Sequence, residues 1–283
     1  MIFFKRLAYK IAIPSFLFLL SIFSPAHLFA QGDLMIYPKR IIFENLKRAQ
    51  ELSLLNNGKD TARYVISVVQ ISMKADGSFQ TITEPDSGQN FADKNFRFFP
   101  RAVVLAPNES QTVKVQLIRT NELTTGEYRS HLYFRAQKEQ KPLGQEIADK
   151  KPTSIAISIV PVFGVSIPVI FRIGESTTKV EIMEKAVKLV KNEKPTLNIK
   201  INRTGNRSVY GDISVEHISP SGKQTKVGLI KGVAIYTPTP SRDFQIPLDG
   251  SKGITFNSGK LHISYFEPTG DKIMLAETEL FLN

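Results

Sequence analysis

One segment of the sequence, Ser154 to Arg172, carries an unusually long alternation of apolar residues. Its odd positions from Ile155 to Phe171 are all apolar. Alternation with a period of two residues predicts a β-strand. Fully extended at roughly 3.3 Å per residue, the segment would be about 60 Å long, several times the length of an average strand. A strand with spare length could lend backbone and side chains to another protein chain.

Two prolines divide this segment. Pro161 and Pro168 each lack a backbone donor, and Gly164 between them allows a bend, so the hydrogen-bonded ladder must be interrupted or lie at an edge. We therefore predict two pieces: Ser154 to Val160 as an accessible donor half, and Val165 to Arg172 within the sheet of its own domain. The alternative is that the whole apolar face covers the core of its own domain.

The first thirty residues have the features of an export signal. These are a cationic start at Lys5, Arg6 and Lys10, an apolar stretch from Ile11 to Phe23, and a small residue for cleavage at Ala26 or Ala30. The apolar stretch is too short to span a bilayer. We predict a cleaved signal peptide at residues 1–30 and export to the periplasm; an uncleaved N-terminal anchor is the alternative.

The remaining length suits two domains of about 110 to 140 residues each. The sequence contains no cysteine, so both cores must be stable without disulfides, and Cys-based zinc sites are excluded. We place an N-terminal domain at residues 31–173 and a C-terminal β-sandwich domain at residues 174–283, with a hinge in the small, polar stretch from Gly174 to Thr178.

The charge is basic but dispersed. Of the net charge of +11, three charges belong to the signal, which leaves +8 for the mature chain. No stripe of arginine and lysine with interleaved aromatic residues is present, so we predict no nucleic-acid partner. The excess charge fits a solvated surface, or the attraction of acidic partners or lipid head groups.

Short strands separated by turn residues predict an all-β fold of two immunoglobulin-like sandwiches. The first set of predicted strands is Leu34 to Phe43, Glu51 to Leu55, Ala62 to Val69, Phe96 to Leu105, Gln111 to Ile118, Tyr128 to Ala136, and the long segment. The second set is Lys179 to Val190, Thr196 to Asn202, Val209 to His217, Lys226 to Ile230, Val233 to Tyr236, Asp243 to Pro247, Lys260 to Phe266 and Ile273 to Phe281. Met183 to Val190 has the local propensity of a helix, but we favour a strand.

The residues that catalysis usually requires are missing from the sequence. None of the four histidines, His27, His131, His217 and His262, has a partner at metal-ligand spacing. Nucleophile elbows and phosphate-binding glycine loops are also missing. We predict a protein that is not an enzyme and has no catalytic residues, metal, cofactor or bound nucleotide.

Three segments, taken in order, resemble a known family. These are Tyr37-Pro38-Lys39-Arg40-Ile41-Ile42-Phe43, then Phe99 to Pro107 followed by Gln111 to Val115, and Gly126 to Phe134 followed by the long segment ending in Arg172. Together they resemble the N-terminal domain of the PapD-like periplasmic pilus chaperones over roughly residues 33 to 173. The resemblance implies a boomerang of two immunoglobulin-like domains that binds secreted fibre subunits by strand donation. The implied donor residues are Ile155, Ile157, Ile159, Phe163 and Val165.

The resemblance also implies site residues in the cleft between the domains. Relatives hold the subunit's terminal carboxylate with two cations, and Arg40 falls at the first position, where a guanidinium suits bidentate binding. Pro168 stands where relatives have the second cation, a lysine, so Arg172 is the candidate replacement. The acidic residue of the family's interdomain ion pair is replaced by Arg129, which leaves Glu127 or Glu267 as the expected interdomain partner of Arg172.

The sequence therefore predicts an ATP-independent periplasmic chaperone of pilus or fibre subunits. An outer-membrane usher is a second partner consistent with the resemblance. The rival prediction is an exported structural or adhesive protein of two immunoglobulin-like domains, which would use the same strands only for its own cores. A secreted carbohydrate-binding or hydrolytic sandwich is disfavoured, because the chain has no tryptophan for sugar stacking.

Overall fold

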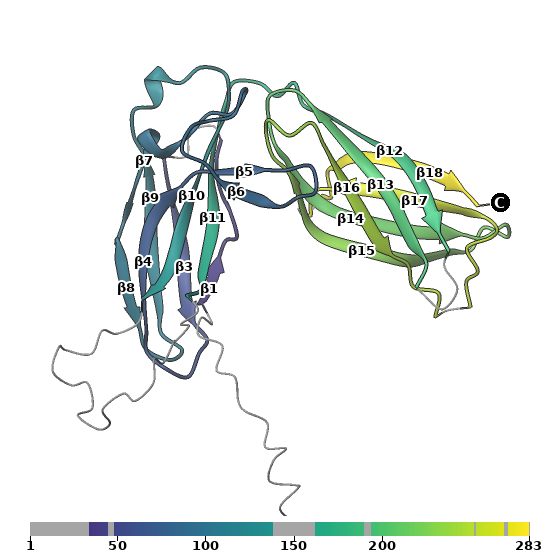
Figure 1. The fold of residues 1–283 in the computed structure, drawn as a ribbon, viewed down its shortest axis with the longest axis horizontal. Coiled ribbons are helices and arrows are strands. Elements are labelled where there is room, and N and C mark those ends of the chain that lie inside the picture. Colours follow the sequence, from purple (N-terminus) through teal and green to yellow (C-terminus); the bar gives the residue numbers. More distant parts are fainter. Residues whose placement is uncertain are drawn as a thin grey trace, which may run out of the picture.

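The computed structural model describes residues 34–44, 48–137, 162–189, 194–251, 253–268 and 271–282. Figure 1 shows two β-sandwiches that meet at one end and enclose an angle, as the predicted boomerang requires. The fold is all-β, which confirms the predicted fold class. Within these described ranges, no helix has the length and apolar character needed to cross a membrane.

The first sandwich consists of two sheets around one core. One sheet has the order β1 (Leu34–Tyr37), β3 (Ala49–Asn56), β9 (Ser110–Leu117) and β7 (Phe96–Phe99). The other has the order β2 (Ile41–Phe43), β11 (Gly164–Ile173), β10 (Gly126–Gln137), β4 (Ala62–Val69) and β8 (Ala102–Leu105). The residues that form this core alternate along the strands, as the period of two requires. Two short 3₁₀ helices, η1 (Asp93–Asn95) and η2 (Thr120–Glu122), lie in the connections.

Two predicted strands each divide into two at a proline. The predicted strand Leu34 to Phe43 forms β1 and β2, and Phe96 to Leu105 forms β7 and β8. The dividing residues are Pro38 and Pro100, both preceded by a cis peptide bond. In each case the two halves belong to different sheets. The prediction of single strands was wrong because proline cannot donate to a ladder, and the chain changes sheet at that point.

The second sandwich encloses a separate core between two sheets. One sheet has the order β12 (Lys179–Lys188), β13 (Thr196–Thr204) and β16 (Ser241–Pro247). The other has the order β15 (Gln224–Ile235), β14 (Val209–Ile218), β17 (Lys260–Phe266) and β18 (Met274–Phe281). The predictions Lys226 to Ile230 and Val233 to Tyr236 were wrong in being separate, because β15 continues through Gly232, whose φ of 72° lies in the region that favours glycine.

The ambiguous segment after Met183 is a strand, as we predicted. Residues up to Lys188 belong to β12, and the register with β13 shifts between Met183 and Ala186. Glu184 lies inside this shift with a φ of 47°. A β-bulge of this kind adds a residue to one strand and locally increases its twist. The strand alternation therefore prevails over the local helix propensity.

A hairpin that we did not predict projects from the first sandwich. It consists of β5 (Ile71–Met73) and β6 (Phe79–Thr81), which pair in antiparallel register. Figure 1 shows the hairpin reaching across to the second sandwich. The predicted strands gave no sign of the contact that it makes.

The long segment is described only in its second half, as β11. Ile155, Ile157 and Ile159 lie outside the described residues. From Gly164 to Ile173, β11 pairs antiparallel with β10. On its other side it pairs in parallel with β2, but only from Val169 to Phe171. The prediction that Val165 to Arg172 is held in the sheet of its own domain is confirmed.

Candidate functional site

The candidate site lies on the outer face of the β2-β11-β10 part of the sheet, where the first sandwich meets the second. Along β10, Leu132 and Phe134 enter the core, so residues of the other parity face outward. These are Glu127, Arg129 and His131. All three are nevertheless buried, with exposed fractions of 3%, 1% and 3%, because the second sandwich covers this face.

The register of the strands arranges the outward residues in rows. In β11, Arg172, Ile170 and Pro168 stand opposite Glu127, Arg129 and His131 of β10. On the other side, Ile170 stands beside Ile42 of β2, with Arg40 and Glu44 two residues before and after Ile42. One row, Glu44, Arg172 and Glu127, is therefore ionic. The next row contains the apolar pair Ile42 and Ile170. The third row joins Arg40, Pro168 and His131.

A small apolar cluster lies at the boundary between the sandwiches, and we call it the hinge cluster. It consists of Met73, Ile170, Ala234 and Tyr236, and Ile42 packs against it. Each of its buried members is at most 7% exposed. The cluster removes apolar surface of both sandwiches from water, which favours their contact.

Glu127 is a buried carboxylate that accepts hydrogen bonds from both sandwiches. Its Oε2 accepts from the backbone N–H of Ser208 at 2.9 Å and from Arg172 Nε at 3.3 Å. Its Oε1 accepts from the hydroxyl of Ser208, from Arg129 Nη1 at 3.4 Å and from Thr237 Oγ1 at 3.5 Å. A buried charge requires such partners because it has lost its hydration.

Arg129 joins the same network from the same strand. Its Nη2 donates to the carbonyl oxygen of Thr237 at 2.9 Å, and its Nη1 donates to Ser208 Oγ at 3.2 Å. The guanidinium carbon lies 4.3 Å from the centre of the Tyr236 ring, a cation–π geometry. Burial lowers the pKa of the Arg129 guanidinium, and the charge of Glu127 opposes that effect. Arg129 therefore contributes to the interdomain contact in place of the expected acid.

Arg172 is fully engaged within the protein. Its Nη1 donates to Glu44 Oε1 at 2.8 Å, its Nε to Glu127 Oε2 at 3.3 Å, and its Nη2 to the carbonyl oxygen of Ser208 at 3.0 Å. Burial lowers the pKa of Arg172, but its hydrogen bond to Glu44 and the charges of Glu127 and Glu44 raise it, and the net shift is upward. Each guanidinium nitrogen already has an acceptor, which leaves little capacity for an added carboxylate.

Arg40 differs from Arg172 in having no acidic partner. Its guanidinium carbon lies 3.1 Å from the centre of the Tyr210 ring of the second sandwich. Its Nε is buried without a hydrogen-bond partner, and no ion pair joins Arg40 to any carboxylate in the described part of the chain. Burial lowers the pKa of Arg40, partly offset by Tyr236 and Tyr210. An incoming carboxylate would supply the anion that this cation lacks.

His131 is a buried histidine at the same boundary. Its ring centre lies 6.1 Å from that of Tyr236, and its Nδ1 has no hydrogen-bond partner among the described residues. Burial and the nearby charge of Arg129 lower the pKa of His131 to about 3. The side chain is therefore neutral at physiological pH.

The β5–β6 hairpin fixes the boundary from a second direction. The hydroxyl of Thr239 donates to the carbonyl oxygen of Met73 at 2.6 Å, and Met73 enters the hinge cluster. At the hairpin turn, Gly77 lies so close to the Arg242 side chain that a Cβ atom there would collide with it. The Arg242 guanidinium is the end of a flexible side chain and can shift, so the φ of 84°, in the region that favours glycine, is the stronger reason for glycine at position 77.

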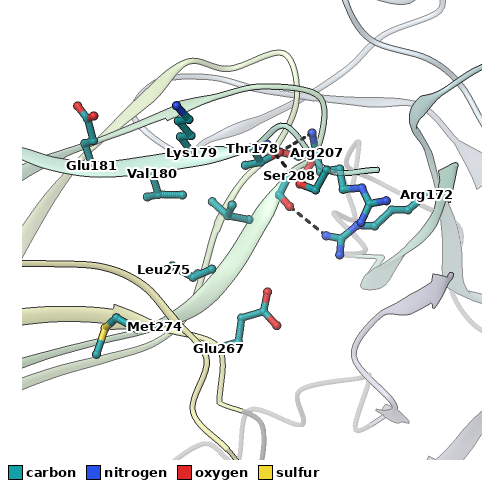
Figure 2. Close-up of a pocket in the computed structure, with 12 residues that line it drawn as sticks. Arg172, Thr178, Lys179, Val180, Glu181, Arg207, Ser208, Glu267, Met274 and Leu275 are labelled. Carbon is teal, nitrogen blue, oxygen red and sulfur yellow. Dashed lines mark hydrogen bonds between the residues drawn. The ribbon is translucent and has the colours of Figure 1, made fainter. Parts of the chain in front are cut away.

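Beside the ionic row, a cleft of about 550 Å³ opens between the sandwiches. Figure 2 shows Arg172, Arg207 and Ser208 on one side and Glu267 on another. Of the two acids expected to pair with Arg172, Glu127 forms the ion pair. Glu267 lines the cleft, and no ion pair joins it to Arg172 in the described ranges.

The free edge of β11 is the second part of the candidate site. From Gly164 to Pro168, no described strand pairs with β11 on the β2 side. The donor candidates Phe163 and Val165 are 47% and 37% exposed here, although Val165 shares its parity with the core residue Ile167. The apolar face of β11 thus extends beyond the end of the core of the first sandwich.

The described residues hold no group of three or more His, Asp or Glu placed to bind a metal ion. The polar atoms gathered at the boundary serve the contact between the sandwiches, and their hydrogen bonds join the two sandwiches directly.

Sequence reasoning missed several residues of the boundary. Arg129 counted only as a departure from the family pattern, and Tyr210, Tyr236 and Met73 were not singled out. One signal was present: Glu127, Arg129 and His131 have the same parity, opposite to that of Leu132 and Phe134. Three polar residues of one parity in an otherwise apolar strand indicate a polar face, but not that another domain buries it.

Comparisons with known proteins were made for the whole chain. No protein-family model and no curated protein matches it. Solved structures of fimbrial chaperones do match. The YadV chaperone is 15% identical with a TM-score of 0.42, over 89% of this chain and 100% of that chain.

Two further chaperone structures give similar values. The CupB2 chaperone of Pseudomonas aeruginosa is 13% identical with a TM-score of 0.41, over 88% of this chain and 100% of that chain. The SafB chaperone of Salmonella enterica, solved with the SafA pilin, is 15% identical with a TM-score of 0.40, over 88% and 96%. PapD-like fimbrial chaperones, the family that the three sequence segments resemble, are thus among the solved structures similar to this chain.

Replacing Glu127 by alanine should strongly destabilise the contact between the sandwiches. Glu127→Ala leaves Arg129 and Arg172 buried without their shared anion, and breaking a buried pair costs about 3–5 kcal/mol. Denaturant unfolding would measure the loss, and small-angle scattering would report the angle between the sandwiches. The control, Glu51→Ala at an exposed position of β3, should change the free energy of unfolding by no more than about 0.5 kcal/mol. Equal effects of the two substitutions would contradict the assigned role.

Acidification should destabilise the protein through His131. The folded pKa of about 3 lies below the unfolded value of 6.5, so the unfolded chain binds the proton first. The contribution of His131 is complete above pH 6.5 and is lost as the pH falls toward 3. One pKa unit corresponds to about 1.4 kcal/mol, so the total is a few kcal/mol. Unfolding free energies from pH 7 to 4 should fall less steeply in His131→Gln; parallel curves would refute the prediction.

Proposed function

We propose that this protein is a periplasmic chaperone that binds secreted pilus or fibre subunits and stabilises them by strand donation, without ATP. The observation that carries the proposal is the free edge of β11 at Gly164 to Pro168. An unpaired edge offers backbone donors and acceptors to an incoming strand. The protein acts by binding and is not an enzyme.

The side chains next to this edge support the same function. Val162, Phe163 and Val165 are 50%, 47% and 37% exposed. Backbone pairing supplies affinity in strand addition, and alternating side chains that fill pockets of the partner supply specificity. A subunit that lacks one strand of its sandwich would gain both from β11. The upstream residues Ile155, Ile157 and Ile159 continue the odd parity of Phe163 and Val165 in the sequence.

Strand β1, which has a free edge near that of β11, supports the same function. Strand β1 pairs only with β3 in the described structure, so its other edge is also free. Its residues Met35 and Tyr37 are 56% and 77% exposed. Since β2, the continuation of β1, runs parallel to β11, β1 lies along the same side of the sandwich as the free part of β11. An incoming subunit would therefore meet two open edges.

Arg40 is the proposed anchor for the subunit's terminal carboxylate. It is partly buried and stacked on Tyr210, and it has no acid to pair with in the described structure. Arg172 was the second candidate, but its three nitrogens bond Glu44, Glu127 and Ser208. We therefore assign Arg172, with Glu127, to the interdomain contact and assign the anchor to Arg40. Glu267 remains a candidate interdomain residue at the cleft.

The remaining parts of the proposal concern export and organisation. A cleaved signal at residues 1–30 would deliver the mature chain to the periplasm, where an outer-membrane usher is a further candidate partner. Residues 31–173 and 174–283 would form the two domains, with the subunit bound mainly by the first. No nucleotide or nucleic acid is required.

Strand donation can be tested with aspartate substitutions at the β11 edge. Affinity capture from a periplasmic extract should recover a small β-rich secreted subunit with the wild type but not with Val165→Asp, because a charge would enter the subunit's apolar pocket. Val104→Asp is the matched control, since Val104 is an exposed valine of β8, the opposite edge strand of the same sheet. Recovery of pure monomer in every case would favour the structural or adhesive alternative.

The anchor can be tested with peptides that carry the C-terminal sequence of the captured subunit. Arg40→Ala should weaken binding of the free-carboxylate peptide by about 1.5–3 kcal/mol, because a charge-assisted hydrogen bond is lost. The amidated peptide should bind both proteins alike in calorimetry. Arg63→Ala, at an exposed position of β4, should change nothing. An unchanged affinity for the free carboxylate in Arg40→Ala would rule out the anchor.

A further inference from the structure

A second pocket, distinct from the cleft at Glu267, opens at the end of the first sandwich. Its volume is about 440 Å³, within the range of small-molecule sites. It lies between the end of β9, the η2 turn, and the ends of β2 and β11. The residues that line it are Phe43, Arg48, Leu117, Ile118, Arg119, Thr120, Asn121, Leu123, Phe171, Arg172 and Ile173.

Part of the wall of this pocket is apolar, because residues of the core of the first sandwich line it. Phe43 and Phe171 belong to the core of the first sandwich and lie edge to face with ring centres 5.4 Å apart. Leu117 and Leu123 pack against the same core and are only partly buried. An apolar group placed here would complete the end of the core and leave water.

The rim of the pocket is cationic. Arg48 and Arg119 are exposed, and neither guanidinium has a hydrogen bond or ion pair with any described residue. Among the described residues that line the pocket, none is acidic. Arg172, the third arginine, is already bonded to Glu44 and Glu127. Two guanidinium groups that have no partner among the described residues thus line a partly apolar pocket.

The backbone holds both rim arginines in fixed positions. Arg119 has a φ of 52°, a left-handed conformation that costs a non-glycine residue free energy. The Asn95 side chain keeps it there by donating to the Arg119 carbonyl oxygen at 3.1 Å. The carbonyl oxygen of Arg48 accepts from the backbone N–H of Leu117 at 2.9 Å. Backbone strain of this kind is often found where side chains are positioned for a ligand.

We propose that this pocket binds a small organic carboxylate with one apolar group. Arg48 and Arg119 would hold the carboxylate, since the guanidinium fork matches its two oxygens, and the apolar group would enter beside Phe43 and Phe171. A ligand with no charge would leave Arg48 and Arg119 without an anion. A ligand without an apolar group would leave water against the apolar side chains of the pocket. The proposal is independent of subunit binding, which uses Arg40 and the β11 edge.

Calorimetry on the full mature protein tests the proposal directly. The probes are 3-phenylpropionate and decanoate, which represent aromatic and fatty acids, and the neutral 3-phenylpropionamide and decanamide as matched controls. We expect saturable binding of at least one acid, and binding of its amide weaker by about tenfold or more. The acid that binds more tightly identifies the source of the ligand. Absence of saturable binding of both acids would overturn the proposal.

Two double variants separate the pocket from the general charge of the protein. Arg48→Gln/Arg119→Gln should weaken acid binding by about tenfold or more. Arg63→Gln/Lys114→Gln removes the same charge from exposed positions on β4 and β9 that do not line the pocket, and should leave binding unchanged. Equal losses in both variants would overturn the proposal, because attraction by net charge would then explain the binding.

A third variant fills the pocket and keeps its cations. Thr120→Phe should abolish acid binding while the thermal unfolding midpoint confirms that the protein is folded. Arg40→Ala should leave acid binding intact, so that failure of this proposal and failure of the subunit anchor are distinguishable. Retention of acid binding in Thr120→Phe, or its loss in Arg40→Ala, would place the ligand elsewhere and overturn the proposal.

Discussion

The contact between the two sandwiches depends on one buried carboxylate. Glu127 stands on the first sandwich, yet the hydroxyl and backbone N–H of Ser208 in the second both donate to it. Arg129 and Arg172 neutralise its charge from the same sheet. A buried anion is tolerated only with complete pairing, and pairing of this kind is directional. The angle between the sandwiches is therefore held by hydrogen-bond geometry more than by apolar area, since the hinge cluster has only four buried members.

The alternation of side chains explains why the candidate site is at this boundary. The core residues of β2, β10 and β11 occupy one parity, so the other parity places Arg40, Arg172 and Glu127 on one outer face. The second sandwich covers most of that face, and the β5–β6 hairpin closes it from the side. The free part of β11 lies beyond this cover. In the described structure, β11 pairs with both β10 and β2 from Val169 to Phe171, and with β10 alone from Gly164 to Pro168.

The sequence predicted the strands well because alternation is a local property, but it could not predict features that depend on distant contacts. Pro38 and Pro100 lie inside segments that we predicted as single strands, and the transfer of the chain to the other sheet at these prolines depends on the shape of the whole sandwich. The pairing of Arg172 with Glu127 was expected from the family resemblance. The role of Arg129 was not, because only the second sandwich supplies its acceptors. The β5–β6 hairpin has three-residue strands, too short for a periodic pattern.

Pro168 now has a physical explanation as part of the same charge arrangement. It stands opposite His131, which is buried and neutral, and four residues before Arg172, which pairs with both Glu44 and Glu127. A lysine at 168 would place another cation beside Arg40 and near Arg129, where the carboxylates of Glu44 and Glu127 are already bonded to arginine. Burying that extra charge would cost free energy without a partner. Proline avoids this cost, and because the parallel pairing with β2 begins only at Val169, its missing N–H removes no bond from that ladder. In the described structure, Arg40 is then the cation without an anionic partner in the row that it forms with Pro168 and His131.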